Sequence, residues 1–439
     1  MLKITTDDLA LFETGMLVIP VCEDGNLSRS PVVGSLIDKA RQFREFKGSA
    51  GDELMLYSPE GVSASRVLFM GLGKKEKIDA ESFRAAAGKA VKRAIKAKQP
   101  DVLLCGHGKK EHVLAMMEGA LLGNHIFDLY KQDKKDKPVE ALVFHVEKAR
   151  QDAFEKAAPA VETGCRGTIL ARDWVSAPPN DKRPDMFARS IVKAADRENL
   201  TIVDIDERNI RKNKMYALLA VGSGSDTKPR MIVIDYRPDR YEKTVVLVGK
   251  GVTFDSGGIN LKPSSGLADM KQDMAGAAVV AATLITASRL ELGHRIIGVL
   301  PLVENMPSGN AYRPGDVIRT ASGKTVEIGN TDAEGRMIMA DAISYAVKQY
   351  APDILIDVAT LTGACKMALG NHIAGVFSFD SRLAGQLVAS GEKTHERCWA
   401  MPMPEDYRDM LKSDIADIRN VGKSLGGRNY RCAVFVRVR

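Results

Sequence analysis

One apolar run limits the folds open to this chain, because it has the composition of a strand that is buried on both faces. Residues 244–249 read Thr-Val-Val-Leu-Val-Gly, a short, β-branched run without charge. Such runs are typical of parallel strands that helices cover on both sides. The run leads directly into Lys250 and then Asp255. Open α/β sheets bind ligands beyond the carboxyl ends of their strands, so we expect a functional site here.

A second polar segment, residues 330–336, holds two carboxylates beside a guanidinium in the sequence Asn-Thr-Asp-Ala-Glu-Gly-Arg. Asp332 and Glu334 are two residues apart, so in an extended loop their side chains would share one side. Two carboxylates held together repel each other, and a divalent cation between them removes that conflict. The segment therefore predicts half of a metal site, with Arg336 able to hold an anion beside it. The alternative is a solvated turn, in which Asn, Asp and Gly are common.

Asp273 is a further candidate ligand. It precedes a long run of small apolar residues, 274–290, which predicts a buried helix. A ligand set rich in oxygen, with little histidine and no cysteine, suits Zn, Mn or Mg and does not decide among them. If Lys250 is a ligand it must be neutral, so the field of the cations would have to lower its pKa.

The length and patterning of the chain predict two domains. Its 439 residues are enough for two hydrophobic cores. We expect a smaller N-terminal α/β domain over 1–150, a connecting helix over 151–172, and a larger C-terminal α/β domain over 173–439 with a mixed, mostly parallel central sheet. The predicted strands of the first domain are 16–21, 66–71, 101–105 and 139–146, with a helix over 82–98. Those of the second are 231–236, 244–249, 296–302 and 354–358.

The composition favours a cytoplasmic protein that engages no membrane. No run approaches the roughly 18 apolar residues that a membrane span requires. The first 25 residues contain Asp7, Asp8 and Glu13 and lack the basic start of a signal peptide. The six cysteines are scattered without a C-x-x-C pair, which favours reduced thiols.

A basic stripe is the only sign of a nucleic-acid partner. The chain carries a net charge of +7, and Lys89, Lys92, Arg93 and Lys96 share one face of the helix predicted over 82–98. A solvated helix face explains this stripe, and contacts to DNA phosphates are the alternative.

The two polar segments resemble those of a known family. Residues 248–263, Val-Gly-Lys-Gly-Val-Thr-Phe-Asp-Ser-Gly-Gly-Ile-Asn-Leu-Lys-Pro, together with 330–336, resemble the leucyl aminopeptidases, also called cytosol aminopeptidases, which are dizinc or dimanganese peptidases. Further matching stretches are 172–175, 178–181, 270–276 and 359–364. The resemblance implies a cytoplasmic homo-hexamer that releases leucine-like residues from peptides with a free amino terminus.

The resemblance also implies a role for each acidic candidate. Asp255 and Glu334 would bridge two divalent cations, Mn or Zn, with Mg also open. Lys250 and Asp273 would complete the tighter metal site. Asp332 would complete the looser one.

Two basic residues would carry the remaining chemistry that the resemblance implies. Lys262 would polarise the scissile carbonyl and stabilise the resulting oxyanion. Arg336 would anchor a bicarbonate ion that acts as general base. The two cations would lower the pKa of a bridging water, which attacks the first peptide carbonyl.

The end of the sequence departs from the family pattern. Residues 430–439 alternate apolar residues with arginine, where relatives continue with a helix of small residues. We expect a truncation or a reading-frame shift after about residue 429, which affects pocket closure and hexamer assembly. Two alternatives to an active aminopeptidase follow. The altered end suggests a truncated, poorly active paralogue, and the basic stripe suggests a DNA-binding accessory or regulatory protein of the same family.

Overall fold

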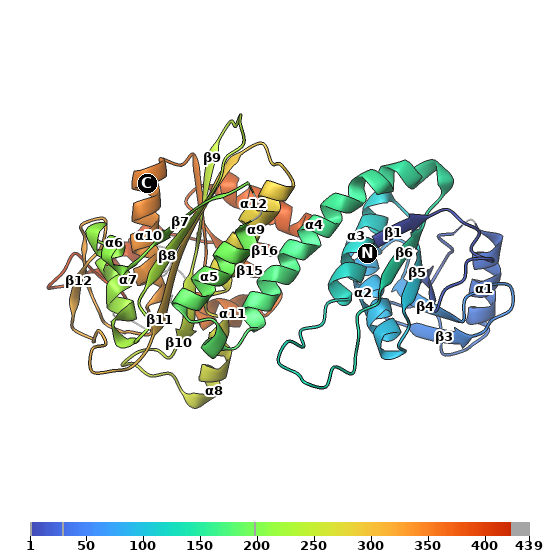
Figure 1. Ribbon diagram of the computed structural model, residues 1–439, viewed down its shortest axis with the longest axis horizontal. Helices are drawn as coiled ribbons and strands as arrows, with labels where there is room; N and C mark the ends of the chain where they lie inside the picture. Colours follow the sequence, from blue (N-terminus) through green and yellow to red (C-terminus); the bar gives the residue numbers. More distant parts are fainter. Residues whose placement is uncertain (1, 29, 197–198, 423–439) are drawn as a thin grey trace. The chain divides into compact units, whose positions relative to one another are not determined.

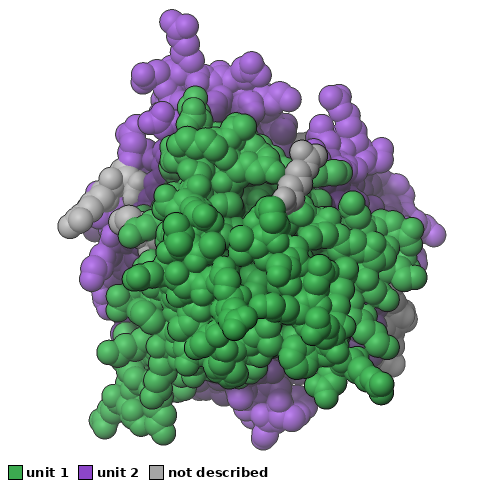
Figure 2. Space-filling view, turned by 90° about the vertical axis from the view of Figure 1, so that its right-hand side faces the viewer, with its two compact units in different colours: residues 1–169 green, residues 170–439 purple. Residues whose placement is uncertain are grey.

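The computed structural model describes residues 2–28, 30–196 and 199–422. The chain forms two compact units, residues 1–169 and 170–439, which Figure 2 colours separately. The predicted truncation after about residue 429 lies outside the described residues. Within the described ranges, no helix has both the length and the apolar character needed to cross a bilayer.

Unit 1 is built on a six-stranded sheet in the order β1-β6-β5-β2-β4-β3. All neighbouring strands run parallel except the edge strand β3, which is antiparallel to β4. The strands are β1 (Leu2–Thr5), β2 (Leu17–Cys22), β3 (Glu53–Tyr57), β4 (Arg66–Gly73), β5 (Asp101–Cys105) and β6 (Ala141–His145).

Helices cover both faces of this sheet. Figure 1 shows α2 (Ala80–Lys96) and α3 (Lys110–Gly123) on one side and α1 (Pro31–Arg41) on the other. The buried side chains divide accordingly, with Phe83 and Val91 of α2 in one cluster and Leu36 and Ile37 of α1 in the other. Unit 1 is therefore a three-layer α/β domain. A long helix, α4 (Gln151–Ser176), follows it and contains the division between the two units.

Unit 2 contains a mixed sheet in the order β14-β9-β11-β8-β7, with β10 also paired to β11. β9, β10 and β14 run parallel to their partners, whereas β8 is antiparallel to both β11 and β7. The strands are β7 (Thr201–Ile205), β8 (Arg230–Tyr236), β9 (Thr244–Gly249), β10 (Gly251–Asp255), β11 (Arg295–Asn305) and β14 (Ile354–Val358).

Two helix layers enclose the sheet of unit 2. Figure 1 shows α5 (Pro184–Ala195) and α9 (Ala275–Arg289) on one side, and α7 (Tyr216–Val221) and α10 (Gly335–Tyr350) on the other. Each layer has its own apolar cluster. The other helices are α6 (Glu207–Lys212), α8 (Ser264–Leu267), α11 (Gly363–Leu369) and α12 (Ser381–Thr394), with 3-10 turns η1 (Lys148–Arg150), η2 (Pro179–Asp181), η3 (Gly222–Gly224), η4 (Ala268–Gln272) and η5 (Glu405–Leu411). The other strands are β12 (Val317–Arg319), β13 (Thr325–Glu327), β15 (Ala374–Phe377), β16 (Cys398–Met401) and β17 (Ile418–Arg419).

The predicted fold class is confirmed, including the mixed, mostly parallel central sheet. The strand predicted over 244–249 is β9, and the buried helix predicted over 274–290 is α9. Three edge strands, β1, β3 and β7, were not predicted. Each is short and carries polar or half-exposed side chains, so its apolar pattern is weak.

Gly276, in the first turn of α9, lies where the helix meets the end of β14. A Cβ atom there would be 2.0 Å from the carbonyl oxygen of Val358 and 2.8 Å from the amide nitrogen of Lys250. Both contacts are with backbone atoms, which cannot move without shifting the strands that carry the site. Glycine is therefore required for the close approach of helix and sheet.

We expect Gly276→Ala to lower the free energy of unfolding by about 1–3 kcal/mol, because the added methyl group overpacks the helix–sheet contact. Urea denaturation measures this change. Gly293→Ala is the control, since a Cβ at Gly293 meets nothing within 4 Å. Equal unfolding midpoints for the two variants would contradict the proposed steric role of Gly276.

Candidate metal centre

The parallel strands of unit 2 bring their carboxyl ends to one edge of the sheet. Lys250 joins β9 to β10, Asp255 ends β10, and Asn305 ends β11. Thr360 follows the end of β14. The structure thus confirms that the polar residues after residue 249 lie at the sheet edge where α/β proteins bind ligands.

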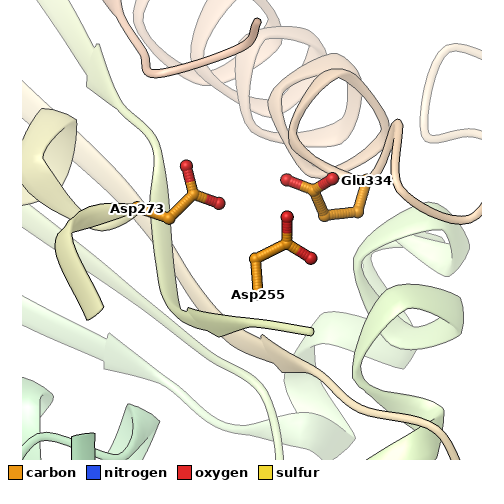
Figure 3. Close-up of side chains that lie close together, drawn as sticks. All are labelled: Asp255, Asp273 and Glu334. Carbon is orange, nitrogen blue, oxygen red and sulfur yellow. The ribbon is translucent and has the colours of Figure 1, made fainter. Parts of the chain in front are cut away.

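Three buried carboxylates meet at this edge. Asp255, Asp273 and Glu334 each offer an oxygen within 4.8 Å of the others, and all three residues are buried. They come from β10, from the turn before α9, and from the residue that precedes α10. Figure 3 shows the three carboxyl groups directed toward one another. Such a group is a candidate ligand set for a cation that prefers oxygen.

The ammonium of Lys250 lies between two of these carboxylates. Its Nζ is 2.8 Å from Asp273 Oδ1 and 2.8 Å from Glu334 Oε1, and it donates to the carbonyl oxygen of Thr360 at 3.1 Å. Burial alone would lower the pKa of Lys250, but the surrounding carboxylates outweigh burial and raise it above the ordinary value. The ammonium of Lys250 therefore compensates the negative charge of Asp273 and Glu334.

The ammonium of Lys262 bridges a second pair of carboxylates. Its Nζ is 2.8 Å from Asp255 Oδ2 and 2.5 Å from Asp332 Oδ1. Burial opposes the charged form, but the two aspartates raise the pKa of Lys262 above its usual value. Lys262 is more exposed than Lys250, with 18% of its side chain accessible to solvent against 2%. It is thus the lysine that a substrate could reach.

The segment 330–336 is not the extended loop that would put Asp332 and Glu334 on one side. Residues 331 and 332 form a turn, and Glu334 has helical backbone angles (φ −78°, ψ −38°). Asp332 therefore contacts Lys262, whereas Glu334 lies with Asp255 and Asp273. The expected geometry was wrong because the segment turns into α10, although both carboxylates still belong to the site.

Arg336 is buried in the first turn of α10. Its Nη1 donates to the carbonyl oxygen of Asn420 at 2.7 Å. The predicted anion site at this guanidinium stays a prediction.

Several residues that support the carboxylates were not singled out from the sequence. Asn305 Nδ2 and the amide of Gly257 both donate to Asp255 Oδ1, at 2.8 and 2.9 Å. Thr360 Oγ1 donates to Asp273 Oδ1 at 2.6 Å. Their shared signal is position, since Asn305 and Thr360 lie at the carboxyl ends of strands parallel to β9. Such donors orient the ligands of a metal site.

Gly335 gives the side chain of Lys250 its space. A Cβ at this position would be 2.5 Å from Lys250 Cε and 2.7 Å from its Nζ. The glycine within the segment 330–336 is therefore explained by the passage of a buried lysine beside α10.

The residues fit a centre for divalent cations. Among the described residues, none donates a hydrogen bond to the buried Asp273 Oδ2. Burial, the largest cause, raises the pKa values of Asp255, Asp273 and Asp332 above the ordinary value for aspartate, although the lysines oppose this shift. Burial thus disfavours the charged form of these carboxylates, and a nearby cation opposes this effect. Each bridging ammonium also shows that the carboxylates are spaced to hold a cation between them.

Comparison with known proteins places the chain in a family. The model of the cytosol aminopeptidase family catalytic domain matches residues 169–438, and that of the family's N-terminal domain matches residues 18–134. The chain is 40% identical to a probable cytosol aminopeptidase of Chlorobium limicola, across 96% of this chain and 88% of the relative. It is 39% identical to a probable cytosol aminopeptidase of Desulfovibrio desulfuricans, across 94% of this chain and 85% of the relative.

The fold agrees with that of a solved structure. The bottromycin maturation enzyme BotP in complex with Mn superposes with a TM-score of 0.86 at 33% identity, across 96% of this chain and 89% of BotP. These matches cover both units and nearly the whole chain. The protein belongs to the cytosol aminopeptidase family, and the family that the sequence resemblance indicated is confirmed.

We expect Asp255→Asn to weaken binding of Mn²⁺ by about tenfold or more, because Asp255 contacts both parts of the site and the amide carries no charge. Calorimetric titration of chelator-treated protein measures this affinity. Asp316→Asn is the control, since Asp316 is a half-buried acidic residue paired with Arg313 outside the carboxylate cluster. Equal Mn²⁺ affinity in the two variants would exclude Asp255 as a ligand.

Proposed function

We propose that this protein is a metal-dependent aminopeptidase that removes leucine-like residues from the amino termini of peptides. The observation that carries the proposal is the gathering of four carboxylates and two lysines at the sheet edge of unit 2, in a member of the cytosol aminopeptidase family.

Five residues would hold the two cations. Asp255 and Glu334 would be shared, Lys250 and Asp273 would complete one position, and Asp332 the other. Bound divalent cations would supply Lewis acidity and lower the pKa of a water molecule toward neutrality. We propose Mn²⁺ as the first ion to test, because BotP is similar in fold and was solved in complex with Mn.

Lys262 would act on the carbonyl oxygen of the substrate. Its ammonium is held by Asp255 and Asp332. Cations that take over these carboxylates would leave the Lys262 ammonium available to hydrogen-bond the oxygen on which negative charge develops. Such preorganised donors are among the largest contributions to catalysis of acyl transfer.

The charge of the site favours an anion beside Arg336. Two divalent cations would balance the four carboxylates, and the charges of Lys262 and Arg336 would remain in excess. A bound anion restores the balance, and bicarbonate could also accept a proton from the attacking water. We therefore propose bicarbonate at Arg336 as the general base.

The cellular location, oligomeric state and substrates of the enzyme are also proposals. The relatives that match most of the chain are called cytosol aminopeptidases, which supports a cytoplasmic location. Assembly into a homo-hexamer rests on the resemblance to that family. The substrates would be peptides with a free amino terminus, because the amine of the first residue would bind one of the cations.

We expect Lys262→Ala to retain Mn²⁺ binding but to lose about two orders of magnitude in turnover, because it removes a charged donor to the developing oxyanion. Hydrolysis of a leucine anilide at saturating Mn²⁺ measures the loss. Lys228→Ala, at an exposed lysine of unit 2, is the control. Wild-type turnover by the Lys262 variant would refute the role assigned to this lysine.

DNA binding is a second candidate function, and the surface of α2 is the observation that favours it. Lys89, Lys92, Arg93 and Lys96 are all exposed on this helix, although Arg93 also pairs with Glu53 at 3.1 Å. The aminopeptidase proposal does not use these charges. A solvated helix face remains the simpler explanation of the stripe.

If α2 binds DNA, the logarithm of the association constant should fall with the logarithm of salt concentration, with a slope of about −0.9 per phosphate contacted. Fluorescence anisotropy with duplex DNA measures this slope. Lys89→Glu combined with Lys92→Glu should reduce both affinity and slope. Binding that is insensitive to salt, or unchanged in the double variant, would exclude α2 as a DNA surface.

A further inference from the structure

Asn420 lies far along the chain from the carboxylates, yet it contacts both ends of the segment 330–336. It follows β17, which runs parallel to β13. Its own amide donates to the carbonyl oxygen of Glu327 at 3.0 Å, which ties Asn420 to the end of this strand pair. Asn420 is completely buried.

The carboxamide of Asn420 holds the backbone just before the metal-site segment. Its Oδ1 accepts hydrogen bonds from the amides of Gly329 and Asn330, at 2.8 and 3.3 Å. Its Nδ2 donates to the carbonyl oxygen of Asn330 at 2.7 Å. A carboxamide is needed for this arrangement, because it combines an acceptor and a donor at one side-chain end.

The backbone of Asn420 reaches the other end of the segment. Its carbonyl oxygen accepts the hydrogen bond from Arg336 Nη1 at 2.7 Å. One buried residue therefore contacts Asn330 at the start and Arg336 at the end. The proposed ligands Asp332 and Glu334 lie between these two contacts.

Gly329 allows this close contact. A Cβ at Gly329 would be 2.6 Å from Val421 Cγ2 and 3.1 Å from Arg419 Nη2. The segment around Asn420 is thus packed directly against the chain that leads into the metal site. A shift of one would displace the other.

We propose that Asn420 is a positioning residue for the metal centre, which sets the backbone from which Asp332 and Glu334 reach the cations and holds the guanidinium of Arg336. The inference deepens the proposed function and rests on it for the roles of these residues. Asn420 contacts none of the four carboxylates directly. It acts through the path of the segment 330–336, as donors outside the ligand shell do in metal sites generally.

Asn124 provides a matched control in unit 1. Its carboxamide forms the same kind of clamp, with Nδ2 donating to the carbonyl oxygen of Val139 at 2.9 Å and Oδ1 accepting from the Val139 amide at 2.7 Å. Alanine at Asn420 or at Asn124 leaves partly buried backbone groups without their partners, so both variants should lose stability. Only the Asn420 variant should disturb the metal centre.

The test compares wild type, Asn420→Ala and Asn124→Ala as full-length chains. Calorimetry with Mn²⁺ after chelation measures metal affinity, and hydrolysis of a leucine anilide at saturating Mn²⁺ measures kcat and KM. We expect Asn420→Ala to weaken Mn²⁺ binding and to lower kcat by about tenfold or more each. KM should change by less than about threefold, since the variant removes no expected contact to substrate. Asn124→Ala should retain wild-type values of all three.

The outcomes separate this inference from the proposed function. Wild-type Mn²⁺ affinity in Asn420→Ala overturns the positioning role, and so do equal losses in Asn420→Ala and Asn124→Ala. A wild-type protein that binds Mn²⁺ but does not hydrolyse the anilide refutes the proposed function, while the calorimetric comparison still decides the role of Asn420. A wild-type protein that binds no Mn²⁺ overturns the metal site and this inference together.

Discussion

Mutual repulsion among four carboxylates is the constraint around which unit 2 is organised. Asp255, Asp273 and Glu334 are buried, and Asp332 is joined to them through Lys262. Buried charges of one sign are strongly unfavourable unless cations lie between them. Two lysine ammonium groups lie between the carboxylates, and divalent cations would meet the same need for positive charge. The residues that gather at the sheet edge are therefore better explained by metal binding than by stability alone.

Close packing then keeps the cluster in place. Lys250 passes beside Gly335, and α9 approaches the end of β14 at Gly276, so two glycines permit contacts that any side chain would block. A layer of donors holds the acids themselves, with Asn305 on Asp255 and Thr360 on Asp273. Ligands held in this way need little rearrangement when a cation binds. The fold thus contributes to function mainly by preorganising charge.

The sequence predicted those elements whose signal is local. β9 and α9 are continuous runs of apolar and small residues. Of the polar residues beside them, Lys250 lies at the end of the strand and Asp273 before the helix, as expected. The edge strands β1, β3 and β7 were missed because one or both of their faces meet solvent. The segment 330–336 was expected to be extended. Its conformation depends instead on the start of α10 and on the hydrogen bonds that Asn420, distant in the chain, accepts from Gly329 and donates to Asn330.

By itself, the sequence determined the family and the candidate site residues, because motifs such as 248–263 and 330–336 combine acidic, basic and glycine residues in an order that also defines the family. It could not determine which charges pair. Only the tertiary structure places Lys250 between Asp273 and Glu334, and Lys262 between Asp255 and Asp332. The physical reason is that these pairings join residues from separate strands and turns. Their distances follow from how β9, β10 and α10 pack together, and no local pattern encodes that packing.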